Sequence, residues 1–192
     1  MQKCRKQKQK RRKGEVPAKS GHNREMLSKI LSKEECAKCR ICCCFDSYDI
    51  WETPYISPTL ASKILQEYAP KQEFIKKDNH FLFKMDKEKD ADLYYCPMLD
   101  NEKGCILGDD KPFDCRIWPL RVMALNETKV ITLSPVCPNM NEKSIKELTK
   151  TATELSDQIF QYADENPEAV KPYLNGYPIL VVEGKKYKDT LV

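Results

Sequence analysis

Half of the ten cysteines in this chain lie within nine residues, Cys36 to Cys44, which read C-A-K-C-R-I-C-C-C. A C-x-x-C-x-x-C-C run brings several thiolates together at almost no loop-closure cost, and thiolates bind soft and borderline metal ions strongly. Four further cysteines stand among prolines and glycines, which aim their side chains and leave nearby amides able to hydrogen-bond sulfur. We therefore predict a metal site with the ligand set Cys36, Cys39, Cys42, Cys43, Cys96, Cys105, Cys115 and Cys137.

The spacing favours an iron-sulfur centre over zinc. C-x-x-C-x-x-C can supply three ligands to a 4Fe-4S cluster with a remote cysteine as the fourth, whereas structural zinc usually takes two separated C-x-x-C pairs. The ferredoxin pattern is incomplete, because Cys42 is not followed three residues later by Cys-Pro. Eight thiolates leave three arrangements open: two four-coordinate sites, one cluster with a second metal, or one metal with a redox-active dithiol.

The two remaining cysteines are left out of the ligand set. Cys4 lies in a basic arm, residues 1–13, that holds eight lysines or arginines and no acid. Such an arm is typical of a disordered tail, here residues 1–23, and the alternative is contact with RNA or another polyanion. Cys44 is read as a spare thiol or a small buried residue.

The compartment decides between metal ligands and disulfides. The basic start of the chain resembles a signal peptide, but no apolar stretch follows it and no segment is apolar enough to span a membrane. We therefore expect a cytoplasmic protein with no membrane partner, and a reducing cytoplasm favours metal ligation.

Hydrophobic patterns predict a loop-rich α+β single domain. Its cysteine-cluster region covers residues 24–140, and a C-terminal helix and strand, within 141–192, pack on the same domain. The predicted helices are 24–35, 57–69 and 141–163, the last with an apolar stripe from Ile145 to Ile159. The predicted strands are 74–75, 80–85, 120–125, 128–133 and 177–182.

The cysteine region resembles the CxxCxxCC cysteine-cluster family, described as zinc- or iron-chelating proteins and including flagellin lysine N-methylase. The similarity runs through C-A-K-C-R-I-C-C at 36–43, Cys96, G-C-I-L-G-D-D-K-P-F-D-C-R-I-W-P at 104–119 and Cys137-Pro138, about half of the chain. Lys111 stands where that family most often has arginine, and Cys44 is extra. Neighbouring cations would offset the charge of the centre: Lys38, Arg40, Lys111, Arg116 and Arg121.

Three functions follow: a metal-binding module, a protein lysine N-methyltransferase that uses S-adenosylmethionine on a protein substrate, and an electron-transfer partner. The resemblance implies the second, yet no G-x-G-x-x-G loop for the nucleotide is present among the six glycines. The C-x-x-x-C-x-x-C spacing of radical enzymes that use this cofactor is absent too. Asp46, Asp49 and Asp114 lie near cysteines and are expected to be solvated.

Overall fold

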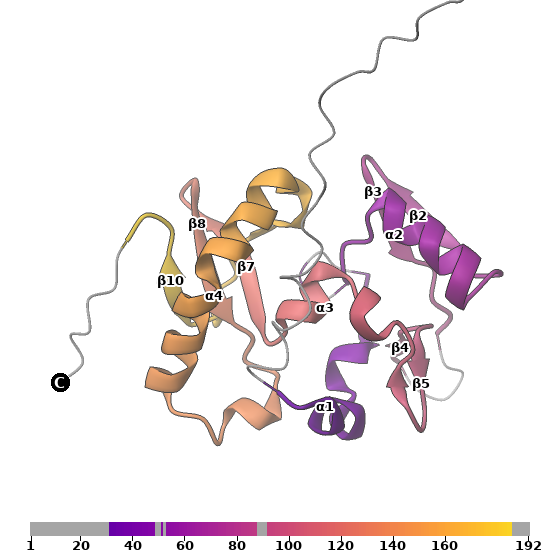
Figure 1. Cartoon of the computed structure of the whole chain (residues 1–192), viewed down its shortest axis with the longest axis horizontal. Coiled ribbons are helices and arrows are strands. Elements are labelled where there is room, and N and C mark those ends of the chain that lie inside the picture. The colour runs from indigo at the N-terminus through magenta and orange to yellow at the C-terminus, as the bar shows by residue number, and fades with distance from the viewer. Residues whose placement is uncertain (1–30, 49–50, 52, 88–91, 186–192) are drawn as a thin grey trace, which may run out of the picture.

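The computed structural model describes residues 31–48, 51, 53–87 and 92–185. The fold is mixed α+β, as predicted, with short strands and much irregular chain (Figure 1). The basic arm and the predicted tail lie outside the described residues. The helices are α1 (Lys33–Cys39), α2 (Pro58–Lys63, continued by a π-turn, Ile64–Tyr68), α3 (Phe113–Ile117) and α4 (Ile145–Glu165).

A four-stranded sheet in the order β10-β8-β7-β9 forms one side of the molecule. Its strands are β7 (Leu120–Leu125), β8 (Thr128–Leu133), β9 (Lys171–Pro172) and β10 (Ile179–Val182). The β7–β8 hairpin has the predicted bounds. Its turn residues Asn126 and Glu127 have φ of 48° and 64°, the left-handed pair that matches the twist of a two-residue hairpin without glycine. At the edge of the sheet, β9 runs parallel to β7.

Helix α4 packs on this sheet, with closest contacts to β10 and β7 (Figure 1). Ser144 caps its first turn in a reciprocal capping box with Glu147. The buried side chains repeat at three and four residues, as predicted: Leu148, Ala152, Leu155, Ile159 and Ala163. Ile145 does not belong to this stripe, because it occupies the first turn and is 57% exposed.

The other side of the molecule is built from α2 and short antiparallel pairs (Figure 1). The pairs are β2 (Phe74–Lys77) with β3 (His80–Phe83), β1 (Cys44–Phe45) with β4 (Tyr94–Tyr95), and β5 (Leu99–Asp100) with β6 (Gly104–Cys105). Both strands of the β2–β3 hairpin were predicted, although β2 is two residues longer and β3 two residues shorter than expected. Ser57 caps α2 through the amide of Leu60, with Pro58 in the first helical position, also as predicted.

The buried apolar side chains form two separate clusters. The larger, which we call the sheet core, holds Trp118, the inner residues of β7, β8 and β10, and the buried face of α4. The smaller, which we call the hairpin core, holds Phe45, Ile56, Ala61, Ile64, Phe83, Met85, Met98 and Leu107. Cys36 and Cys42 pack against the sheet core, whereas Cys96 and Cys105 pack against the hairpin core. The cysteine region therefore lies between the two cores.

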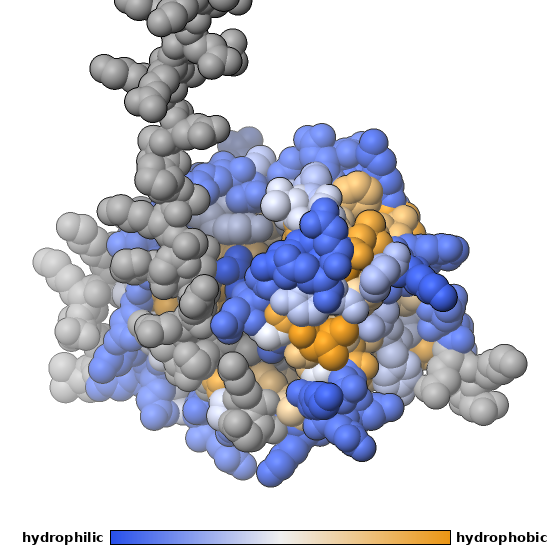
Figure 2. Space-filling model, turned by 45° about the vertical axis from the view of Figure 1, so that its right-hand side comes forward, coloured by the Kyte–Doolittle hydropathy of each residue, from blue (hydrophilic) through white to orange (hydrophobic). Residues whose placement is uncertain are grey.

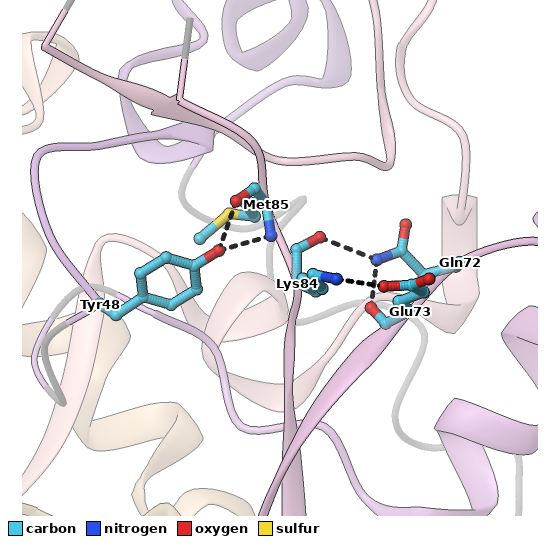
Figure 3. A network of polar contacts seen from close by, with 5 residues as sticks. All are labelled: Tyr48, Gln72, Glu73, Lys84 and Met85. Carbon is cyan, nitrogen blue, oxygen red and sulfur yellow. Dashed lines mark hydrogen bonds and ion pairs between the residues drawn. The ribbon is translucent and has the colours of Figure 1, made fainter.

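Polar contacts fix the chain that leaves the cysteine run (Figure 3). The Tyr48 hydroxyl donates to the carbonyl of Met85, at 2.6 Å, and accepts from its amide. One side chain therefore satisfies both backbone polar groups of Met85, which follows β3. Alongside, the Gln72 side-chain amide donates to the carbonyls of Glu73 and Lys84, and Lys84 forms an ion pair with Glu73. The Tyr48 bonds attach the chain after the run to the hairpin core, and the other bonds hold together the ends of the β2–β3 hairpin.

Helix α1 differs from its prediction. Leu31 and Ser32 were expected inside a helix, but Ser32 is extended and caps α1 in a capping box with Glu35. The first residues of that predicted helix, 24–30, lie outside the described residues. Within the part of the chain that the structure describes, no helix combines the length and apolarity needed to cross a membrane.

Candidate metal centre

The cysteine run begins on a helix and leaves it through a tight turn. Cys36 and Cys39 are three residues apart on α1, so both lie on one face of the helix. Arg40 ends α1 in the left-handed conformation, with φ of 58°, and a 3-10 turn over Ile41–Cys43 follows. The Arg40 guanidinium is bound to Asn101, through its carbonyl and its side-chain oxygen, so it ties the turn to the β5–β6 segment.

Backbone pairing brings the distant cysteines to this run. The amide of Cys96 donates to the carbonyl of Cys43 at 2.8 Å, next to the pairing of β1 with β4. Cys105 follows on β6, which pairs with β5 opposite Leu99. Gly104 lets β6 approach α1, because it has φ of +77° and a Cβ there would lie 3.1 Å from the Cβ of Ala37.

All eight predicted ligands line two adjoining cavities. The larger cavity, of about 240 Å³, is lined by six of them: Cys36, Cys42, Cys43, Cys96, Cys105 and Cys115. The smaller cavity, of about 10 Å³, is lined by Cys36, Cys39, Cys42 and Cys137. None of the nine described cysteines forms a disulfide. Cys44 lines neither cavity, and its thiol lies 3.5 Å from the carbonyl of Arg40.

Backbone amides donate to the sulfurs of three cysteines that are remote from the run. Cys96 accepts from the amide of Met98, Cys105 from those of Leu107 and Gly108, and Cys137 from that of Asn139. In each case one donor lies two residues after the cysteine, Gly108 lies three residues after Cys105, and the Trp118 side chain adds a further bond to Cys137. Such bonds favour the thiolate, which is the form that binds metal, and lower the pKa of each thiol. The turns around these cysteines had predicted such amide–sulfur hydrogen bonds.

Burial opposes ionisation of the same thiols. It raises the pKa of Cys36 to about 11 and that of Cys96 to about 12, and it raises the pKa of Cys115 well above the ordinary range. Cys42 and Cys43 share a hydrogen bond, which lowers the pKa of Cys42 and raises that of Cys43. A thiolate on Cys42 is also favoured by the charges of Arg121 and Lys111.

A buried charge cluster, which sequence reasoning missed, forms part of the cavity wall. Asp114 is only 2% exposed, so the expectation that it is solvated was wrong. Its carboxylate accepts from the amide of Tyr55 at 2.9 Å and lies 3.5 Å from the Arg121 guanidinium and 3.7 Å from the Lys171 ammonium. One carboxylate between two cations leaves a net positive charge beside the thiols.

Arg121 is the cation most closely built into the site. It is 4% exposed, lines the larger cavity and lies 4.8 Å from the Trp118 ring, a cation–π arrangement. Its Nε is buried without a hydrogen-bond partner among the described residues. Lys111 lines the larger cavity too. Arg116 instead lines a separate cleft with Tyr162, and Lys38 is exposed.

The thiols surround the cavities without enclosing a common point. In the described ranges, no three cysteine, histidine or carboxylate side chains are already arranged as ligands of one metal ion. Cysteine side chains move among staggered χ1 wells, which shifts a sulfur by about 3 Å. The fit to a metal rests on the donor chemistry, namely thiols gathered from five segments, amides directed at their sulfurs and a buried guanidinium.

Comparisons of the sequence with family models and curated proteins, and of the chain with solved structures, give no significant match. The resemblance to the cysteine-cluster family therefore stays a prediction, and the site has to be argued from its own geometry.

Proposed function

We propose that this chain is a cytoplasmic metal-binding protein that holds an iron-sulfur centre, with zinc as the alternative, through cysteine thiolates. The observation that carries the proposal is the larger cavity, which gathers six thiols from distant segments. Cysteines that only filled a core would not need amides directed at their sulfurs. An electron-transfer partner and a structural module are both compatible with such a centre.

The surrounding charges support an anionic centre. Four thiolates around zinc, or around an oxidised cubane, carry a net charge of about −2, which is costly to bury without compensation. The net positive charge on Asp114, Arg121 and Lys171 and the neighbouring Lys111 would offset it. The buried Nε of Arg121 has no partner among the described residues, and an anionic centre in the cavity would supply one.

The chain's own contribution is to collect the thiolates and shield them. Cys43, Cys96, Cys105 and Cys115 would hold the centre in the larger cavity, and an iron-sulfur centre would supply one-electron chemistry there. Phe45, Phe83, Met98 and Leu107 line the same cavity and make part of its wall apolar.

The test is anaerobic purification of the full chain followed by analysis of iron, sulfide and zinc and an absorption spectrum. A cluster gives a brown protein with visible absorption, whereas zinc is colourless. Separate Cys39→Ser and Cys115→Ser variants should each lower the bound metal. Cys44→Ser is the matched control, because Cys44 belongs to the same run but lines neither cavity. Full occupancy in both ligand variants would contradict the proposal.

A protein lysine N-methyltransferase is the second candidate, favoured by a groove beside the cysteines. This groove, of about 360 Å³, is lined by Cys39, Cys42, Cys44, Trp51, Trp118, Tyr177 and Asp46 among others. Aromatic rings and a carboxylate suit an alkylammonium side chain, whereas Arg121, which also lines the groove, opposes one. The hydrophobic patches on the mainly hydrophilic surface in Figure 2 are also consistent with a protein partner. Equilibrium binding of S-adenosylmethionine at millimolar concentration to the loaded protein tests this candidate, and absent binding would reject it.

A further inference from the structure

The eight thiols divide between the two cavities in a way that suggests two centres. Four of them line the larger cavity alone: Cys43, Cys96, Cys105 and Cys115. Two line the smaller cavity alone, namely Cys39 and Cys137. Cys36 and Cys42 line both. Assigning these shared thiols to the smaller cavity gives two complete sets of four, and any other division leaves one set incomplete.

The two hydrophobic cores support the same division. Cys137 is a member of the sheet core, and Cys36 and Cys42 pack against it, so three of the four thiols at the smaller cavity belong to one core. Cys96 and Cys105 belong to the hairpin core, whereas Cys115 lies on α3 between two members of the sheet core, Phe113 and Ile117. The set at the larger cavity therefore bridges the two cores.

The cavities also differ in size. The smaller has room for about one water-sized atom and is lined by Leu31, Trp118 and Pro138 as well as by its thiols. That size suits a single four-coordinate ion and leaves no room for a cluster of several atoms. The larger, at about 240 Å³, has room for a centre of several atoms.

The arrangement of α1 opposes a cluster at the smaller cavity. C-x-x-C-x-x-C spacing alone would favour a cubane bound by Cys36, Cys39 and Cys42. Here Cys36 and Cys39 lie on a closed helical turn, and the cavity that they share with Cys42 is too small for eight cluster atoms.

Building on the proposed metal-binding function, we propose that the chain carries two separate centres. A single tetrahedral ion, zinc by its ligand chemistry, is held by Cys36, Cys39, Cys42 and Cys137. An iron-sulfur cluster is held by Cys43, Cys96, Cys105 and Cys115. The ion fixes the cysteine run to the sheet core, and the cluster joins the sheet core to the hairpin core.

The test compares two variants, each lacking a thiol that lines only one cavity. The full chain, Cys137→Ser and Cys105→Ser are purified anaerobically, loaded with Zn²⁺ and with ferrous and ferric iron and sulfide, and analysed for zinc and iron per chain and for visible absorption. The wild-type protein should hold both metals. Cys137→Ser should lose most of its zinc and keep the visible absorption, whereas Cys105→Ser should lose the absorption and keep its zinc.

Cys137 is buried, so Cys39→Ser provides a second route to the same result at a half-buried position. Cys44→Ser should match the wild type. If Cys39→Ser and Cys105→Ser are both soluble and folded and each loses both metals equally, the chain has one shared centre. If Cys39→Ser loses iron and keeps zinc, the assignment of the two metals is reversed. Either result overturns the two-centre proposal while metal binding stands. A wild-type chain that binds neither metal would reject the proposed function itself.

Discussion

Gly104 lies so close to Ala37 that a methyl group on it would sit 3.1 Å from the Ala37 Cβ and 3.3 Å from the Ala37 Cα. This contact sets the distance between α1, which carries Cys36 and Cys39, and β6, which carries Cys105. The neighbouring atoms belong to backbone or to a short side chain, so they cannot turn away. The approach of the two cysteine-bearing elements therefore depends on a missing side chain.

Gly104→Ala should destabilise the protein by about 2–4 kcal/mol, because it combines overpacking with a left-handed φ. It should also reduce metal loading, since β6 has to move away from α1. Thermal unfolding and metal analysis measure the two effects. Gly176→Ala is the matched control, because φ there is +97° and no atom lies within 4 Å of the added Cβ. Equal metal loss in both variants would show that the close approach is unimportant.

Asp114→Asn should destabilise the metal-free protein more than the loaded protein. The amide keeps the shape and can still accept from Tyr55, but Arg121 and Lys171 lose their buried counter-charge, a loss of about 3–5 kcal/mol. An anionic centre in the cavity would compensate part of that loss. Urea unfolding of both forms measures the difference.

Asp92→Asn is the control for Asp114→Asn. Asp92 is 99% exposed and pairs with Lys87 on the surface, so its change should leave both forms unaffected. If Asp114→Asn destabilised the metal-free and the loaded protein equally, the charge cluster would not be energetically coupled to the metal site.

The sequence predicts the local elements and the gathering of cysteines better than it predicts their surroundings. The β7–β8 hairpin follows from alternation within fourteen residues, a purely local pattern. Asp114 was misread because its partners, Arg121 and Lys171, come from two different strands, and the second is remote in the chain. No periodicity reports such a contact. The role of Gly104 was also hidden, since a glycine beside a cysteine indicates only a turn.

The division of the cysteines between the two cavities also depends on tertiary contacts, which the spacing along the chain does not report. Cys42 and Cys43 are neighbours in the chain, yet Cys42 packs against the sheet core while the carbonyl of Cys43 accepts from the amide of Cys96. Spacing alone left several arrangements of eight thiolates open. Two adjoining cavities of unequal size, bordered by different cores, provide the information that spacing lacks.

Metal loading should release protons and weaken as the pH falls. Burial raises the pKa of Cys36 to about 11 and that of Cys96 to about 12, so these thiols are protonated in the metal-free protein at pH 7–8. Each must lose its proton to bind metal, and a lower pH favours the protonated, metal-free form. Adding Zn²⁺ in weak buffer with a pH indicator should release about four protons for each four-thiolate site filled, or fewer where Cys42 is already ionised. Metal affinity that is equal at pH 6 and pH 8 would contradict thiolate ligation.

Removing metal should loosen one part of the fold before the rest. Strands β4, β5 and β6 contain two residues each, too few to be stable alone, and residues 92–117 carry three of the four thiols that line only the larger cavity. Chelation should therefore raise amide hydrogen exchange across 92–117 first. The β7–β8 hairpin has six paired residues in each strand and a buried face under α4, so it should stay protected. Hydrogen exchange followed by mass spectrometry on loaded and chelated protein measures both regions. Unchanged protection of 92–117 after complete metal removal would show that the hairpin core holds this segment without help from the metal.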